Sequence, residues 1–338
     1  STLKLHKQTL PFLNISLYLN DIKPVQSLTI ENTSETDSAS LEIKITADLP
    51  CIEPFNYSVQ FVPAKKDVKI PLENLKVNRD FLNKLSETEK ANITIEVYEK
   101  EVAILKETIA INIHPLEHFG GFQVLPELIA AYVTPNHPYI YQIKRKAIEI
   151  LEKQGLKTAF EGYQSNDPER VLQIMSAIYS AIQSEEIIYS SLPPGYEEMG
   201  QRLRLLNTIQ QEKFGNCIDI SLLFAACLEA VDLNPILIIV RGHAFVGCWL
   251  QDEKFSEIVN DDKTAITKRL SKGIREMAAV EATSVCKGNN VKFSDALNAS
   301  EAQLVQKEEF LLSVDIRRAR PLRIRPLPLL TNSTGTQL

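Results

Sequence analysis

The residues from 217 to 230 constrain the fold more than any other stretch. In CIDISLLFAACLEA, apolar residues occupy almost every position instead of a single stripe, which is typical of a helix buried on all sides. Two apolar stretches follow, PILIIV and AFVGCWL, and both have the length of a buried strand. A buried helix followed by buried strands needs further layers to cover it, so we expect an α+β domain around a central helix.

The first 115 residues show a different periodicity. Ile43 and Ile45 alternate with polar neighbours in LEIKITAD, and Ile93, Ile95 and Val97 do the same in NITIEVY. Period-2 alternation predicts strands with one buried face, and several short strands separated by turns indicate an immunoglobulin-like β-sandwich over 1–115. One short helix is expected near residues 78–86. No catalytic group of residues is evident here, so we interpret this part as a structural or partner-binding module.

Both periodicities break between the two parts of the chain. A length of 338 residues suggests two domains, and Gly120, Gly121 and two nearby prolines mark the boundary. We expect a linker at 116–124, a second domain at 125–328 and a disordered polar tail at 329–338. Prolines at first-turn positions predict helices from Pro138 and Pro168. The further expected elements are helices at 202–213, from 217, near 262–270 and from 294, and strands at 236–240, 244–250, 278–283 and 310–316.

Composition excludes several classes of protein. The formal net charge is −6, so a nucleic-acid footprint over the whole chain is not implied. The five cysteines are widely spaced and form no CxxC, which favours free thiols in a reducing, cytoplasmic compartment. No apolar run approaches the roughly 18 residues that span a bilayer, so no membrane association is expected. Phosphate-loop, GxGxxG and HExxH motifs are absent from the sequence, and we expect neither a cofactor nor a metal.

Cys217 stands at the predicted start of the buried helix. Asn216 is a favourable N-cap, and Asp219, three residues later, has the position to complete a capping box. The first turn of a helix presents unpaired N–H groups and the positive end of the dipole, which favour an anion such as a thiolate. Cysteines that merely pack in a core are common, and we assign that role to Cys227, Cys248 and Cys286.

A base and an acid are needed to activate such a thiol. His243 opens the second apolar stretch and is the candidate base, although a lone histidine at a strand edge is more often structural. Glu281 is the candidate third member, with Asp252 and Asp261 as rivals. An oxyanion hole would use the backbone N–H of Cys217 and the side-chain amide of Gln211, although a surface role for that glutamine is the simpler interpretation.

At these residues the sequence resembles the transglutaminase-like branch of the papain-like cysteine fold. The matching motifs are Gly215-Asn216-Cys217, His243 at the start of a strand, and Glu281-Ala282-Thr283. The resemblance covers about 126–328 and implies a Cys217 nucleophile, a His243 base and an orienting acid at Glu281. The family more often has aspartate as the acid, and the segment between the histidine and the acid is long here.

A second resemblance covers more of the chain. GQRLRLLNTI, GNCIDISLLFAACLEA, GHAFVGCWL and VDIRRARPLRIRPLP together resemble the N-terminal region of large bacterial proteins that carry a superfamily-one helicase and an endonuclease-like domain. This resemblance implies that the chain is part of a longer polypeptide with such domains downstream. No helicase motif occurs in the sequence itself.

Two functions from different classes follow. The first is cysteine-dependent hydrolysis or acyl transfer on a protein or peptide substrate, as in a protease, deamidase or transglutaminase. The second is a non-catalytic scaffold that binds a protein or nucleic-acid partner for downstream domains. The basic run from Arg317 to Arg325 is usually a solvated edge, but it could contact nucleic acid.

Overall fold

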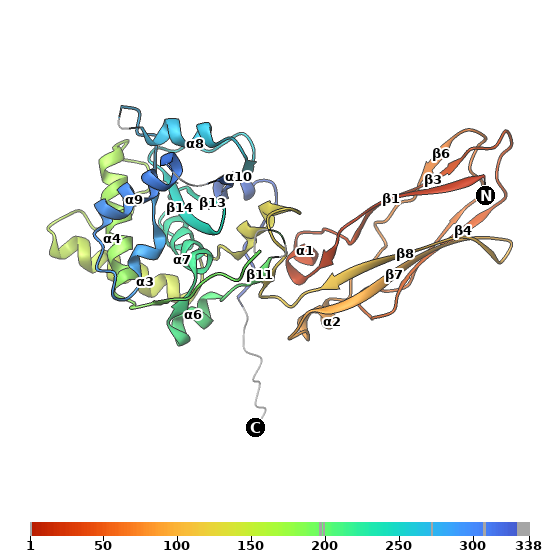
Figure 1. Ribbon diagram of the computed structural model, residues 1–338, viewed down its shortest axis with the longest axis horizontal. Helices are drawn as coiled ribbons and strands as arrows, with labels where there is room; N and C mark the ends of the chain where they lie inside the picture. The colour runs from red at the N-terminus through yellow and green to blue at the C-terminus, as the bar shows by residue number, and fades with distance from the viewer. Residues whose placement is uncertain (1, 196–197, 199, 272, 307–308, 330–338) are drawn as a thin grey trace, which may run out of the picture. The chain divides into compact units, whose positions relative to one another are not determined.

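The computed structural model describes residues 2–195, 198, 200–271, 273–306 and 309–329. The chain divides into two compact units, Ser1–Gly120 and Gly121–Leu338 (Figure 1). The division falls inside the segment 116–124 that was expected to be a linker. Sheets and helices are both present, which confirms the predicted α+β fold class. The tail expected to be disordered lies, apart from Leu329, outside the described residues.

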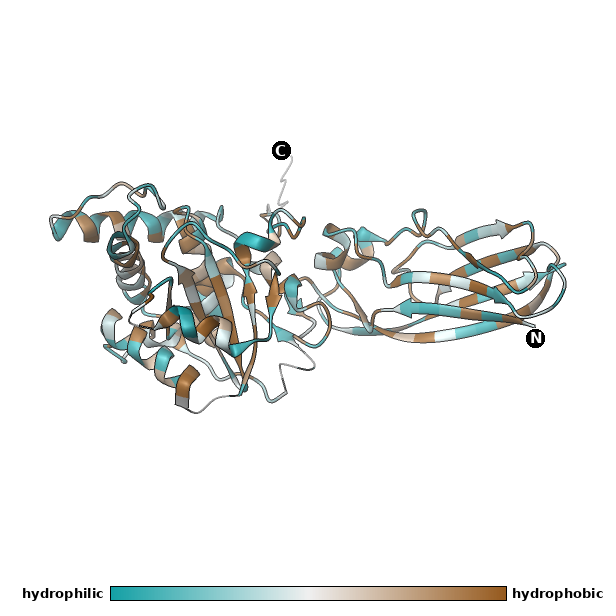
Figure 2. Cartoon of the chain, turned by 90° about the horizontal axis from the view of Figure 1, so that it is seen from above, coloured by the Kyte–Doolittle hydropathy of each residue, from teal (hydrophilic) through white to brown (hydrophobic). Residues whose placement is uncertain are grey.

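The unit Ser1–Gly120 contains two β-sheets. Ile43 and Ile45 in one sheet, and Leu28 and Ile30 in the other, are fully shielded from solvent, as period-2 alternation requires. Figure 2 shows the resulting change between hydrophobic and hydrophilic residues along these strands. The sheets have the orders β2 (Phe12–Leu13), β8 (Val102–Ile113), β7 (Glu89–Glu99), β4 (Leu41–Ala47), β5 (Phe55–Val59) and β1 (Leu3–Thr9), β3 (Val25–Asn32), β6 (Asp67–Lys69). Helices α1 (Ile15–Leu19) and α2 (Arg79–Asn83) and strand β9 (His118–Phe119) also belong to this unit. Its immunoglobulin-like character stays a prediction.

The unit Gly121–Leu338 is built on a five-stranded antiparallel sheet. Its elements are η1 (Pro126–Tyr132), α3 (Pro138–Lys153), α4 (Pro168–Gln183), β10 (Ile188–Tyr189), β11 (Gln201–Arg202), α6 (Leu206–Glu212), β12 (Phe214–Gly215), α7 (Cys217–Glu229), β13 (Pro235–Val240), β14 (His243–Trp249), β15 (Val259–Asn260), α8 (Lys263–Leu270), β16 (Met277–Val280), η2 (Ala282–Val285), α9 (Phe293–Gln306), β17 (Phe310–Asp315) and α10 (Ile316–Ala319). The strand order is β15-β17-β13-β14-β16. Strands β13 and β14 are buried on both faces, which explains why their sequences are apolar without alternation.

Helix α7 packs against β13 and β14, and α3 and α4 contact it as well. Every residue from Cys217 to Leu228 is buried. This burial confirms the expected central helix. It also fixes the position of the first turn of α7, because a helix enclosed on several sides cannot shift without disturbing close-packed side chains.

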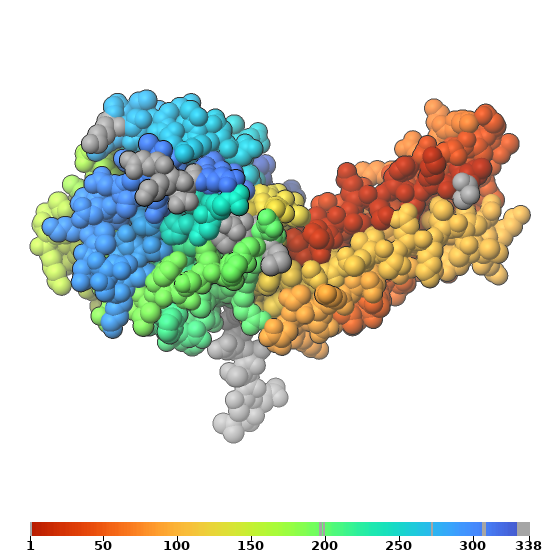
Figure 3. Space-filling model, viewed as in Figure 1, coloured from red at the N-terminus to blue at the C-terminus, as the bar shows by residue number. Residues whose placement is uncertain are grey.

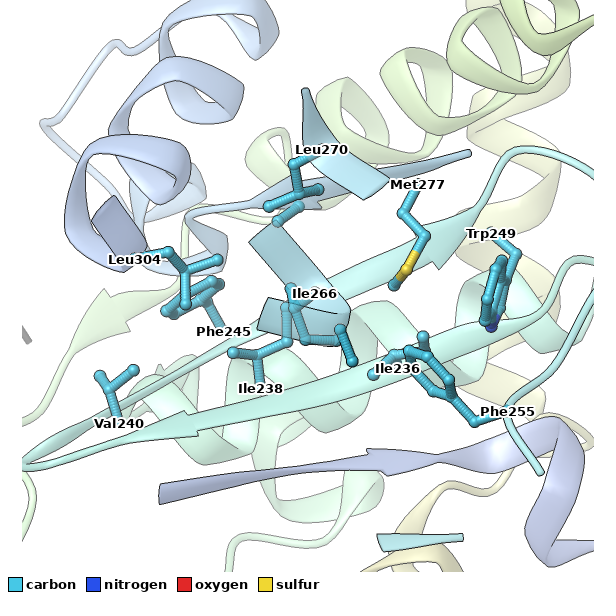
Figure 4. Packing of buried hydrophobic residues seen from close by; sticks show 12 residues of the cluster. Ile236, Ile238, Val240, Phe245, Trp249, Phe255, Ile266, Leu270, Met277 and Leu304 are labelled. Atoms are coloured by element: carbon cyan, nitrogen blue, oxygen red, sulfur yellow. The ribbon is translucent and has the colours of Figure 1, made fainter. Parts of the chain in front are cut away.

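A second apolar layer lies between the sheet and the helices α8 and α9. Figure 4 shows Ile266 of α8 and Leu304 of α9 directed toward side chains of β13 and β14, among them Ile238 and Phe245. In the space-filling view the surface above this layer is formed largely by the cyan and blue segments that contain α8 and α9 (Figure 3). The sheet is therefore covered by helices over two faces, and its strands are held rigidly.

Two predicted elements are wrong at one end. The helix expected at 202–213 begins only at Leu206, because the backbone N–H of Arg204 donates to the buried carboxylate of Asp219 (3.0 Å) and residues 201–202 form a strand. The strand expected at 278–283 ends at Val280, because the carboxylate of Glu281 accepts a hydrogen bond from the N–H of Thr283 (3.2 Å) and caps η2. Both errors arise from side-chain hydrogen bonds that compete with regular structure.

Candidate active site

The start of α7 is a capping box. The side-chain oxygen of Asn216 accepts from the N–H of Asp219, and the carboxylate of Asp219 accepts from the N–H of Asn216, each at 3.0 Å. Cys217 is therefore the first helical residue, as predicted from the sequence, and it is fully shielded from solvent. Its thiol lies at the end of the helix where unpaired N–H groups favour negative charge.

His243 is brought to this helix by a tight hairpin. Val240 of β13 pairs with His243 of β14 across Arg241 and Gly242. Gly242 has φ +73°, in the left-handed region that glycine adopts without steric cost. The thiol of Cys217 interacts with the imidazole, and this interaction contributes to a raised pKa of His243. The structure thus brings together the two residues that the sequence analysis paired.

Glu281 is the third group of this arrangement. Its two carboxylate oxygens lie 3.0 and 2.8 Å from Nε2 of His243. Strand β16 runs antiparallel to β14, so Glu281, which follows Val280, lies near the beginning of β14. The N–H and hydroxyl of Thr283 donate to the same carboxylate (3.2 and 2.6 Å) and fix its orientation.

Within this arrangement, His243 and Glu281 each stabilise the charged form of the other. Burial alone would lower the pKa of His243, but its hydrogen bonds and charge interactions with Cys217 and Glu281 prevail and raise the pKa to about 10. Burial alone would raise the pKa of Glu281, yet the hydrogen bond and positive charge of His243 hold it below the ordinary value. At that pKa the imidazole of His243 carries a positive charge at neutral pH, next to the sulfur of Cys217.

The remaining cysteines of this unit lie in different environments. Burial raises the pKa of Cys227, Cys248 and Cys286, and in each case the negative charge of a nearby carboxylate raises the pKa further. These thiols stay protonated at neutral pH, in keeping with a packing role. Among the described residues, no group of three or more histidine, cysteine or acidic side chains has an arrangement that could hold a metal ion.

Gln201 is a residue that the sequence analysis missed. It is 4% exposed, and its Oε1 accepts from the side-chain amide of Asn216 (3.3 Å), next to the candidate nucleophile. Its Nε2 is buried and has no hydrogen-bond partner among the described residues. Gln211, the predicted oxyanion-hole residue, is exposed on α6 and makes no hydrogen bond to a described residue of the site. An unpaired buried amide donor beside Cys217 makes Gln201 the better candidate for that role.

The rival acids have other positions. Asp252 is exposed and accepts from the side chain of Asn234 (3.2 Å), and Asp261 is exposed as well. The carboxylate of Asp219 is fully buried and serves the capping box. It also accepts from the backbone N–H and the guanidinium of Arg204 (3.0 Å each). The structure gives neither Asp252 nor Asp261 a contact with His243 among the described residues.

The basic run from Arg317 to Arg325 is not uniformly available. Arg320 forms a two-point ion pair with Glu229 (both 2.8 Å) and donates to three backbone carbonyl oxygens. Arg317 and Arg323 are exposed. The run therefore includes one arginine that ties the chain after β17 to α7, and binding of nucleic acid stays a prediction for the exposed members.

Comparisons with known proteins do not assign the chain to a family. No protein-family model matches the chain, and no curated protein matches it. A solved structure of a protein from Parabacteroides distasonis, described as a candidate protease, is similar over 65% of this chain with 9% sequence identity and a TM-score of 0.24. The chain spans 40% of the length of that protein. No helix in the described part of the chain combines the length and the apolar character needed to cross a membrane.

Proposed function

We propose that the unit Gly121–Leu338 is a cysteine-dependent hydrolase or acyltransferase of the transglutaminase-like type. The observation that carries this proposal is that Cys217, at the start of a buried helix, interacts with His243, whose Nε2 lies 2.8 Å from the carboxylate of Glu281. A nucleophile, a base and a group that orients the base are the parts that thiol catalysis requires. The substrate would be a protein or peptide carbonyl.

The mechanism follows from the placement of these groups. The thiolate of Cys217 attacks the carbonyl carbon, and the π electrons move to the oxygen. The oxyanion accepts hydrogen bonds from the N–H of Cys217 and from Nε2 of Gln201. Collapse expels the amine, which takes a proton from the imidazolium of His243, and a thioester remains. Water or a second amine, deprotonated by the neutral imidazole, then attacks the thioester and restores the thiolate and the imidazolium.

Selective alkylation tests the proposal inside one protein. All five cysteines are buried, so exposure cannot by itself make one of them react faster. We expect iodoacetamide to alkylate Cys217 at pH 7 at least about ten-fold faster than Cys248, because thiolate and not thiol is the nucleophile. Peptide mapping by mass spectrometry measures both rates. The preference should fall strongly in His243→Gln, and activity on any substrate should be lost in Cys217→Ala.

A non-catalytic binding module is the second candidate. The complete burial of Cys217 favours it, because a substrate must reach the sulfur. If Cys217 reacts no faster than Cys248, the catalytic proposal is wrong and the scaffold interpretation takes its place. In that case the exposed Arg317 and Arg323 become the first surface to test, by salt-dependent binding of single-stranded DNA.

The resemblance to large helicase-containing proteins extends either proposal. The unit would then act within a longer polypeptide, on or with its downstream domains. Co-purification of the unit with a separately expressed downstream segment of the same protein would test this, and unchanged helicase and nuclease function in the full-length Cys217→Ala protein would count against a catalytic contribution.

A further inference from the structure

The short ribbon β10–β12 leads directly to the candidate nucleophile. Tyr189 lies opposite Gly215, which is two residues before Cys217. The N–H of Ile188 donates to the carbonyl of Lys213 (2.8 Å), and the N–H of Ser190 donates to that of Gly215 (2.9 Å). Because successive residues of a strand direct their backbone groups to opposite edges, the N–H and C=O of Tyr189 face away from β12.

That outer edge of β10 is open at Tyr189. Two residues before Tyr189, the carbonyl of Ile187 accepts from the N–H of Lys287 (2.8 Å) on the same edge. The backbone N–H and C=O of Tyr189 have no hydrogen-bond partner among the described residues. An unpaired edge residue is a template for another extended chain. Burial raises the pKa of Tyr189, and charge interactions with Cys217, Glu281 and Cys286 raise it further.

The ribbon also exposes apolar side chains. Ile188 and Tyr189 are each 44% exposed, and Phe214 is 42% exposed. Ile188 and Phe214 are direct partners, so their side chains lie on one face, while Tyr189 lies on the other. Three of the four residues of this ribbon are therefore large, apolar and accessible, immediately before the nucleophile.

The ribbon is fixed relative to α7. Arg204 donates to the hydroxyl of Ser190 (3.4 Å) through one guanidinium nitrogen and to the buried carboxylate of Asp219 (3.0 Å) through the other. Asp219 in turn holds the first turn of α7. The open edge and the thiol thus keep a constant separation, as a substrate-positioning surface requires.

We infer that β10 is the docking edge for the substrate, and that the substrate is a polypeptide segment bound in extended conformation with an apolar side chain against Ile188 and Phe214. This inference rests on the proposed function. The peptide backbone pairs with the N–H and C=O of Tyr189, which gives affinity, and the exposed apolar side chains of the ribbon select the side chain of the peptide. The adjoining carbonyl of the peptide is then presented to Cys217.

Reactive peptides and iodoacetamide separate binding from nucleophilicity. The probes are a leucine-rich tripeptidyl chloromethyl ketone, its aspartate-rich counterpart, and the leucine-rich probe with methylated backbone nitrogens, which cannot donate to the edge. We expect the leucine-rich probe to alkylate Cys217 at least about ten-fold faster than either of the others, the effect of burying one apolar side chain or gaining one to two hydrogen bonds.

Variants of the ribbon provide the second arm. Ile188→Ser and Phe214→Ser should each slow the leucine-rich probe about ten-fold and leave the iodoacetamide rate unchanged, because both side chains are exposed and neither belongs to the Cys217–His243–Glu281 arrangement. Tyr141→Ser, at an exposed apolar residue on α3, is the matched control and should change neither rate. Equal rates for all three peptides, or ribbon variants that behave as Tyr141→Ser does, would overturn the inference while leaving a fast iodoacetamide reaction intact. A slow iodoacetamide reaction at Cys217 would instead overturn the proposed function, and this inference with it.

Discussion

Replacement of Asp219 by alanine tests whether the start of α7 is held as described. The carboxylate of Asp219 is fully buried and accepts from the backbone N–H groups of Asn216 and Arg204 and from the guanidinium of Arg204. Asp219→Ala leaves the buried N–H of Asn216 and the partly buried N–H of Arg204 unpaired, and a fully buried donor costs about 1–3 kcal/mol, so we expect a loss of roughly 2–4 kcal/mol in the free energy of unfolding. The guanidinium is 30% exposed and adds little, because water can solvate it.

Asp262 provides the matched control for this prediction. It caps α8 by accepting one hydrogen bond from the N–H of Thr264 (2.9 Å), but it is exposed. Asp262→Ala should therefore cost only the usual ~0.5–2 kcal/mol of a lost N-cap. The single tryptophan, Trp249, is buried in β14 and reports unfolding of this unit by fluorescence in urea. Equal midpoint shifts for the two variants, at unchanged slopes, would refute the argument from burial.

Two further predictions concern charge. The pKa of His243 is raised in the folded state, so its stabilising contribution is complete below its ordinary pKa near 6.5 and is lost as pH rises to about 10. The difference in unfolding free energy between the wild type and His243→Gln should accordingly shrink from pH 6 to pH 10 in urea titrations, and a constant difference would contradict the described contacts. Arg320→Ala should destabilise the unit by about 1–3 kcal/mol, because it removes the ion-pair partner of the partly buried Glu229 and one donor from each of three carbonyl oxygens. Arg317→Ala, at an exposed site, should change the midpoint little, and similar shifts for both arginines would argue against a structural role of Arg320.

The elements that depend on local pattern could be predicted from the sequence. The capping residues Asn216 and Asp219 predicted that α7 starts at Cys217. The apolar runs predicted the ends of β13 and β14 to within one residue. The pairing of Cys217 with His243 was predicted because His243 opens a strand soon after the buried helix and because both residues match the family resemblance. For the start of α7 and for the two strands, the determining residues lie within a few positions of the feature they determine.

Features that depend on distant side chains could not be predicted. The sequence of 202–213 has a helical pattern, but the hydrogen bond from Arg204 to Asp219, fifteen residues away, keeps the chain extended before Leu206. A local pattern does not reveal this bond. Gln201 is brought to the nucleophile by that same extended segment, so a search for an amide near Cys217 in sequence selected Gln211 instead. Glu281 was placed on a strand, whereas its own carboxylate ends the strand by capping η2.

The protonation state of His243 tests the central claim most directly. The chain has only five histidines, and the spectrum of His243→Gln identifies the resonance that belongs to His243. If its imidazole lies between the sulfur of Cys217 and the carboxylate of Glu281, with a pKa of about 10, both ring nitrogens are protonated at pH 8 in ¹⁵N NMR. Removal of the partner charge in Cys217→Ala should lower that pKa. A neutral imidazole at pH 8 in the wild type would contradict the thiolate–imidazolium pair on which the proposed function depends.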